Sequence, residues 1–207
     1  MYTRRLLAID PSLTCSGWAL FSIESEKLLA VGKIRSLAPS RPLAERLRDL
    51  QARITGMLEK LELKINDVLI CEAPTTMRDP RAAFKVEQVR GIFETIGRSR
   101  SLIVPGRINP RSVHYEIMGL RGRQIVREQI KQAAVQVVRS LYDAPLSGMG
   151  FDPTPSELAR NQDIVDAILV GSLGVSWIKN ALVAGTDLEK YFEGRKQSRR
   201  RFVAGRV

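Results

Sequence analysis

The sequence is poor in the residues that bind zinc and has no long apolar run. It contains one histidine, His114, and two cysteines among 207 residues. A zinc site built from these three residues would lack the usual fourth ligand, whereas sites made of oxygen donors stay open. The apolar run after the basic start at residues 1–5 ends at Asp10, which is too early for a signal peptide. No stretch approaches the length of a membrane span, so we expect a soluble, cytoplasmic protein without a membrane partner.

Acidic residues are in the minority. The chain has 22 Asp and Glu residues against 33 Lys and Arg residues, which gives a net charge of +11. This balance favours a polyanionic partner, either nucleic acid or an anionic membrane surface, and charge alone does not choose between them. Cys15 and Cys71 are compatible with a disulfide, but a reducing cytoplasm favours two free, partly buried thiols.

The first third of the chain predicts three strands and a helix. Apolar runs at 6–10, 17–23 and 27–34 are separated by short polar turns, which indicates an antiparallel meander. From Pro42 to Leu61 apolar residues recur at helical spacing. This period predicts a long amphipathic helix after the meander.

Two of the predicted strands end in an acid followed by a proline. Asp10 stands before Pro11, and Glu72 stands two residues before Pro74 at the end of a strand predicted from about residue 67. A lone carboxylate at the end of a buried strand is costly to desolvate. Each of these acids therefore needs a nearby cation or a helix N-terminus.

The rest of the chain alternates helices with short connections. The elements we expect are a helix over 80–98, a fifth strand over 101–104, a basic, glycine-jointed lobe over about 105–127 and a helix to about Tyr142, then a loop over 143–155, a core helix over 156–184 and a mobile basic tail over 185–207. The order predicts one α/β domain over residues 1–184. Its mixed five-stranded sheet would combine the antiparallel meander with parallel strands, and helices would flank it.

A pair of acids lies in the last predicted helix. Asp163 and Asp166 are three residues apart, so they share a helix face with Cβ atoms about 5–6 Å apart. They could form an exposed polar stripe, but the strongly apolar run from 164 to 170 leaves little room for one. Two strand-end acids and an acid pair on one helix are the parts of a two-Mg²⁺ nuclease site. There, ions about 3.5–4 Å apart activate a water and stabilise the leaving 3′ oxygen.

These residues resemble the RuvC-type Holliday junction resolvases of the RNase H-like superfamily. The Asp10 strand with its polar turn to Trp18, then Glu72, then Asp163-x-x-Asp166 follow the order and rough spacing of that family. Further similarity lies at residues 82–91, Pro110, Val113, Gly119, Gly122 and residues 127–130. The resemblance extends, with gaps, from about Leu6 to Leu173.

The resemblance implies an RNase H-like fold and a homodimer that binds a four-way DNA junction and nicks two opposing strands symmetrically. Carried over by position, Asp10, Glu72, Asp163 and Asp166 would be the catalytic, metal-binding acids for two Mg²⁺ ions, with Mn²⁺ as a substitute. Arg127 and His114 fall at basic positions of the family. Arg111, Arg121 and Arg123 lie in the Arg- and Gly-rich lobe, and Arg78 and Lys85 are further candidates for phosphate contact.

The sequence also departs from the family. Thr75 stands where bacterial members often carry an aromatic that probes the junction's bases, so the preferred cleavage sequence stays open. The basic tail exceeds what the family core needs, which is typical of phage-type or divergent members. A branch-migration motor as partner is not identified by the sequence.

Other functions stay open at this point. One alternative is a less specific RNase H-like nuclease acting on branched DNA, flaps or RNA–DNA hybrids. Another is a non-catalytic DNA-binding protein on the same fold. An actin-like or sugar-kinase-like ATPase is disfavoured, because such proteins need two copies of the domain and a second phosphate loop.

Overall fold

The computed structural model describes residues 4–74, 79–121 and 125–195. Its elements in chain order are β1 (Arg5–Asp10), β2 (Cys15–Ser22), β3 (Leu28–Arg35), α1 (Leu43–Lys60), β4 (Val68–Glu72), α2 (Pro80–Ser99), β5 (Arg107–Ile108), α3 (Pro110–Glu116), α4 (Arg127–Gly148), α5 (Pro155–Arg160) and α6 (Gln162–Val183). A further helical segment covers residues 188–195.

The five strands form one mixed sheet in the order β3-β2-β1-β4-β5. β1, β2 and β3 form an antiparallel meander, and β4 and β5 join it in parallel, first against β1 and then against β4. The mixed five-stranded sheet predicted from the sequence is confirmed. Because β1 and β4 are parallel neighbours, their carboxyl ends lie at the same edge of the sheet.

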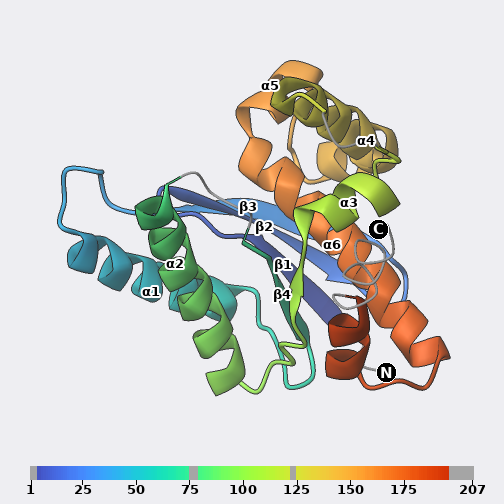
Figure 1. Cartoon of the computed structure of the whole chain (residues 1–207), viewed down its shortest axis with the longest axis horizontal. Coiled ribbons are helices and arrows are strands. Elements are labelled where there is room, and N and C mark those ends of the chain that lie inside the picture. Colours follow the sequence, from blue (N-terminus) through green and yellow to red (C-terminus); the bar gives the residue numbers. More distant parts are fainter. Residues whose placement is uncertain (1–3, 75–78, 122–124, 196–207) are drawn as a thin grey trace, which may run out of the picture.

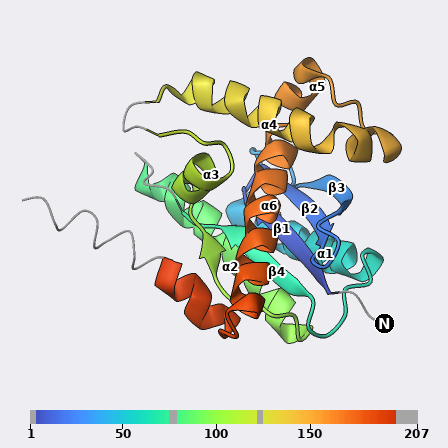
Figure 2. The same cartoon turned by 90° about the vertical axis from the view of Figure 1, so that its right-hand side faces the viewer.

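Helices cover both faces of the sheet. α1 and α2 pack on one face, and α6 crosses the other, with α3, α4 and α5 around it (Figure 1; Figure 2). Successive residues of β1 alternate between the two cores: Leu6 and Ala8 face α6, while Leu7 and Ile9 face α1 and α2. This burial on both sides explains why the central strands read as continuous apolar runs.

α6 corrects the expectation that no stretch approaches the length of a membrane span. Within the described residues it is the one helix long and apolar enough to cross a bilayer, but 72% of its apolar window is buried inside the fold. Gly171 and Gly174 let it lie close on the sheet, since a Cβ at these positions would come within 2.2 Å of Phe21 and 2.8 Å of Leu6. Its apolar composition is therefore that of a core helix.

The fifth strand lies later than predicted. Residues 101–104 contribute only an isolated parallel bridge, between Ile103 and Val68, and β5 follows at Arg107–Ile108. Between them Pro105 has no N–H for a ladder, and Gly106 adopts φ +155°. The pairing of this edge is thus interrupted, and it resumes opposite Cys71 and Glu72.

The last two predicted helices have different limits in the structure. α4 continues through Pro145 to Gly148, where the prediction placed a loop from residue 143. Leu146 is fully buried, so packing stabilises the extra turn despite the proline. The single helix expected over 156–184 is instead α5 and α6, which are separated at Asn161, whose φ is −113° and ψ 41°.

The described fold extends beyond the boundary expected at residue 184. Leu188 and Phe192 are buried, and the ring of Phe192 packs edge-on against Trp177 with centroids 5.2 Å apart. The first part of the predicted tail is therefore part of the core. Residues 196–207 lie outside the described residues. Cys15 and Cys71 are both free thiols, as predicted.

Candidate active site

A row of three residues across the sheet sets the position of the acids. Asp10 at the end of β1 lies opposite Gly17 of β2, which in turn lies opposite Lys33 of β3. A Cβ on Gly17 would stand 1.8 Å from the backbone oxygen of Asp163. Only glycine lets the first turn of α6 rest on the sheet here, and this contact places Asp163 and Asp166 beside Asp10.

Glu72 reaches the same place from β4. Ile9 and Cys71 are register partners in the parallel pair of β1 and β4, so Asp10 and Glu72 follow them side by side at the strand ends. Their side chains lie close enough for each to shift the pKa of the other. The two strand-end acids and the helix acids predicted from the sequence are therefore brought together.

Burial and mutual repulsion make these carboxylates hard to ionise. Burial first, then the charges of Asp166 and Asp163, raise the pKa of Asp10 from 3.8 to about 7. Burial and the charge of Asp10 raise the pKa of Glu72 well above 4.5. Burial also raises the pKa of Asp166 to about 6, although a 2.9 Å hydrogen bond from Gln162 opposes the shift. Such a cluster of perturbed acids is typical of a functional site.

Asp163 differs from the other three acids because it has a direct ion pair. Its Oδ2 lies 3.3 Å from Nζ of Lys33, whose side chain is only 14% exposed. Burial and the neighbouring Asp163 carboxylate raise the pKa of the Cys15 thiol. Asp163 is thus held at the β2 and β3 side of the cluster.

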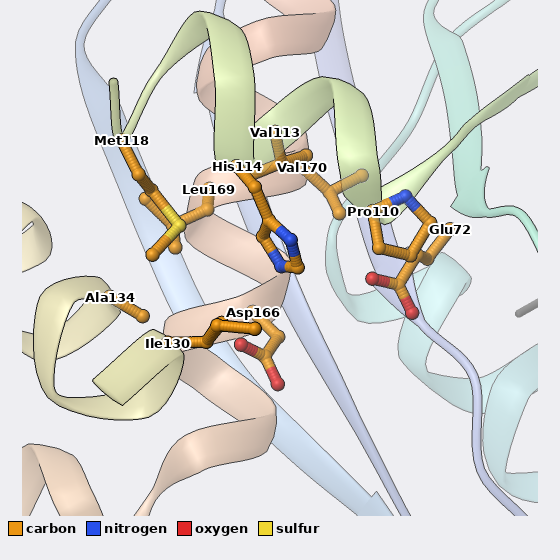
Figure 3. Close-up of a pocket in the computed structure, with 10 residues that line it drawn as sticks. All are labelled: Glu72, Pro110, Val113, His114, Met118, Ile130, Ala134, Asp166, Leu169 and Val170. Atoms are coloured by element: carbon orange, nitrogen blue, oxygen red, sulfur yellow. The ribbon is translucent and has the colours of Figure 1, made fainter. Parts of the chain in front are cut away.

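His114 lies at the other side of the cluster. It lines a small cavity of about 20 Å³ together with Glu72, Asp166 and apolar residues of α3, α4 and α6. Figure 3 shows its imidazole pointing into the same space as the two carboxyl groups. Burial and the nearby charge of Arg111 lower the pKa of His114, which favours the neutral ring.

The turn after β1 is closed by serine hydroxyls. The Oγ of Ser16, which is fully buried, accepts from the backbone N–H of Ser12 and donates to its carbonyl, both at 2.9 Å. Arg46 of α1 donates to the backbone oxygen of Leu13 at 3.1 Å and to Ser36 at 2.9 Å. These bonds fix the hairpin that carries Asp10.

A buried network supports Glu72 from the side of α2. Arg90, which is 2% exposed, donates from Nε to the backbone oxygen of Glu72 at 2.7 Å and pairs with Glu87. Arg107 of β5 pairs with Glu87 at 3.1 Å and with Glu94 at 2.6 Å. The end of β4 is therefore tied to α2 and β5 by alternating charges.

The carboxylate oxygens of the acid cluster are chemically suited to bind a hard divalent cation. Carboxylate oxygens are the ligands that Mg²⁺ and Mn²⁺ prefer, and a bound cation would relieve the repulsion among the buried acids. Over residues 4–74, 79–121 and 125–195, no three Asp, Glu, His or Cys side chains are already arranged to hold one ion.

Comparisons with known proteins show similar sequences and a similar fold. No protein-family model matches the chain. The crossover junction endodeoxyribonuclease RuvC of Cereibacter sphaeroides is 28% identical over 127 residues, which is 61% of this chain and 72% of that protein. RuvC of Parvibaculum lavamentivorans is 32% identical over 115 residues, 55% of this chain and 63% of that protein. The Thermus thermophilus RuvC structure shares the fold at 18% identity, with a TM-score of 0.61 over 86% of this chain and 96% of that one.

This chain is related to the RuvC-type Holliday junction resolvases. The relationship confirms the resemblance seen in the sequence, and the RNase H-like sheet agrees with it. The roles proposed for individual residues rest on the geometry of this chain.

The basic residues predicted to contact DNA lie at different places around the acid cluster. Arg127 begins α4, and its charge lowers the pKa of Asp166. Arg111 lies on α3 near His114, and Arg121 stacks over the ring of Tyr115 with its guanidinium carbon 5.5 Å from the centroid. Lys85 is exposed on α2. Arg78 and Arg123 lie outside the described residues.

Three charged residues near the acid cluster were not predicted from the sequence. Lys131 of α4 also lowers the pKa of Asp166, and Lys33 and Arg90 contact Asp163 and Glu72 directly. Arg90 had a detectable signal, because it falls on the apolar stripe of α2 next to Val89. Lys33 had none, since its place opposite Gly17 depends on strand register.

Proposed function

We propose that this protein is a metal-dependent endonuclease that resolves four-way (Holliday) DNA junctions by paired, symmetric nicks. One observation carries the proposal: acids from β1, β4 and α6 meet at one edge of the sheet in a chain related to the RuvC-type resolvases. Acids that only cap turns or helices, or that form an exposed stripe on a helix, would not be buried next to one another. Such an arrangement is unfavourable without a cation, which supports a metal-dependent reaction.

In this proposal Asp10, Glu72, Asp163 and Asp166 hold two Mg²⁺ ions, with Mn²⁺ as a substitute. When bound, the ions supply an activated water for in-line attack at phosphorus and stabilise charge on the leaving 3′ oxygen. Asp10 and Glu72 fix the strand side of the site, and the contact at Gly17 fixes the helix side. His114 orients the scissile phosphate from the cavity that it shares with Glu72 and Asp166.

The proposed partner is branched DNA. Arg127 and Lys131 of α4 and Arg111 of α3 bring positive charge to the acid cluster, where a phosphate backbone would run. Lys85 and Arg121 extend this basic surface, and Arg78 and Arg123 are added on the sequence alone. Such contacts supply affinity and orientation without reading bases, so binding should weaken strongly with salt.

Symmetric nicking needs two active sites, so we propose that the protein acts as a homodimer. We propose that it does so in the cytoplasm. A Thermus thermophilus RuvC has been solved in complex with Holliday junction substrate, which supports the choice of a four-way junction. Light scattering of the purified protein, alone and with a synthetic junction, tests the dimer. A monomer on the junction would contradict paired nicking.

The test of function is cleavage across a substrate panel. With Mg²⁺, the protein should cut a four-way junction at two opposing strands, and it should leave forks, flaps, linear duplex and RNA–DNA hybrid largely intact. Asp10→Asn and Glu72→Gln should abolish cleavage and retain junction binding, whereas Glu45→Gln, in the first turn of α1, should cut normally. Equal cleavage of linear duplex would favour a less specific nuclease. Binding without cleavage in Mg²⁺ or Mn²⁺ would favour a non-catalytic DNA-binding protein.

A further inference from the structure

Lys33 is an unusual residue for the middle of a strand beside an acid cluster. It lies in β3 between Gly32 and Ile34, and its side chain is only 14% exposed. The register of the meander places it opposite Gly17, in the same cross-strand row as Asp10. An ammonium group is therefore built into the edge of the proposed metal site.

The missing side chain at Gly17 lets Lys33 and Asp163 meet. The first turn of α6 rests on Gly17, so Asp163 lies above β2, the strand that pairs with β3. From there its Oδ2 is 3.3 Å from Nζ of Lys33. Among the described residues, Asp163 is the one acid of the cluster with a direct ion pair.

The ion pair divides the cluster into two unequal parts. Asp10, Glu72 and Asp166 face one another and depend on burial, hydrogen bonds and more distant charges. At Asp163 an ammonium already takes up one carboxylate oxygen. A divalent cation that approaches this oxygen must displace the ammonium and overcome its repulsion, which is weakly screened because Lys33 is nearly buried.

We propose that Lys33 is an internal cation that competes with a divalent metal ion for Asp163, so that the two ions of the site bind with unequal affinity. The proposal rests on the proposed function, since it assumes that the four acids hold metal. Lys33 is a positioning residue: it holds the Asp163 carboxylate until the weaker ion binds. The ion held by Asp10, Glu72 and Asp166 is the tighter one.

The experiment measures Mn²⁺ binding to the full-length, DNA-free protein by the loss of the free-ion paramagnetic resonance signal. The wild type should bind one ion tightly and one weakly. Lys33→Met should tighten the weaker ion by roughly tenfold, because one competing charge is removed. Lys33→Arg should keep the wild-type affinities. Lys60→Met, which removes an exposed lysine at the end of α1, is the matched control and should change neither.

A double-mutant comparison isolates the pair. In the Asp163→Asn background, Lys33→Met should no longer affect the weaker ion, since the carboxylate for which lysine competes is gone. Unchanged or weaker Mn²⁺ binding in Lys33→Met alone would overturn the proposal and leave the proposed function intact. If the wild type and Asp10→Asn were equally unable to bind Mn²⁺, the metal site itself would be wrong.

Discussion

The charge of Asp10 limits the stability of the metal-free protein. Its pKa is about 7 in the folded chain and 3.8 as the ordinary value, so between these pH values the folded state retains a proton that the unfolded state has lost. Stability therefore falls as the pH rises from about 4 to about 7. A carboxylate selected for stability alone would not be placed here, which accords with a role in holding a cation.

Asp10→Asn should stabilise the metal-free protein at pH 8. The gain should be on the order of 2 kcal/mol, less than the full shift implies, and it should be largely lost near pH 4, where Asp10 is protonated in the folded state and about half protonated in the unfolded state. Urea denaturation in EDTA at the two pH values measures it. Glu45→Gln, in the first turn of α1, should show no such pH dependence. A loss of stability at pH 8 in Asp10→Asn would contradict the repulsion described for the cluster.

Gly17→Ala should impair cleavage more than folding. The added Cβ would stand 1.8 Å from the backbone oxygen of Asp163, so the first turn of α6 must move away from the sheet. We expect a loss of junction cleavage of at least about 100-fold, since an ångström-scale misplacement of reacting groups has an effect of that size. The control is Gly56→Ala in α1, where nothing lies within 4 Å and the change should be neutral or slightly stabilising. Normal cleavage by Gly17→Ala would show that this contact does not set the acid geometry.

At the scale of elements, α2 and β4 are coupled by the buried Arg90. Arg90→Met removes the bond to the backbone oxygen of Glu72 and leaves Glu87 without one of its two cations. We expect a loss of about 3 kcal/mol in unfolding free energy, as for other broken buried ion pairs, together with slower cleavage. Urea unfolding and single-turnover cleavage measure the two effects.

The matched control for Arg90→Met is Arg98→Met on the same helix. The Arg98 side chain is 57% exposed and its pair with Glu94 is 3.7 Å long, so its loss should cost less than about 1 kcal/mol. Equal effects of the two substitutions would mean that burial of Arg90 adds nothing to the pair.

Elements with continuous or periodic apolar runs were predictable, and those decided by neighbours were not. β1, β4 and α1 were close to their predicted limits because burial on both faces, or on one helical stripe, is written in their own residues. β5 has only two residues, and the register of β4 decides its place. The turn through Pro145 depends on the burial of Leu146, which no local pattern reveals.

The residues of the candidate site also divide into those that were predictable from the sequence and those that were not. The acids were visible because each interrupts an apolar run, and the structure brings them together at one edge. The basic partners were harder to predict, since the ion pair of Lys33 depends on a row of residues from three strands. It is therefore easier to predict from the sequence which groups react than to predict which groups position them.

At the scale of the whole molecule, the buried segment at 188–195 changes where the basic tail begins. Phe192 is fully buried against Trp177, and a buried aromatic of this kind contributes about 2–3 kcal/mol. Truncation after Ala184 should therefore lower the Tm as well as weaken DNA binding. An effect of that truncation on binding would not by itself identify contacts made by the tail.

Truncation after Arg195 separates the two effects. It keeps Phe192 and removes five cationic residues, namely Lys196, Arg199, Arg200, Arg201 and Arg206. Because Phe192 is kept, the Tm should stay within about 2 °C. If the removed side chains contact the phosphate backbone, junction affinity should fall. The dependence of log affinity on log salt should then become shallower by roughly one unit for each phosphate that is no longer neutralised. Fluorescence anisotropy of a labelled junction from 50 to 200 mM salt measures the slope. An unchanged slope with an unchanged Tm would show that the five cations serve no DNA contact, and that the basic residues around the acid cluster supply the electrostatic binding.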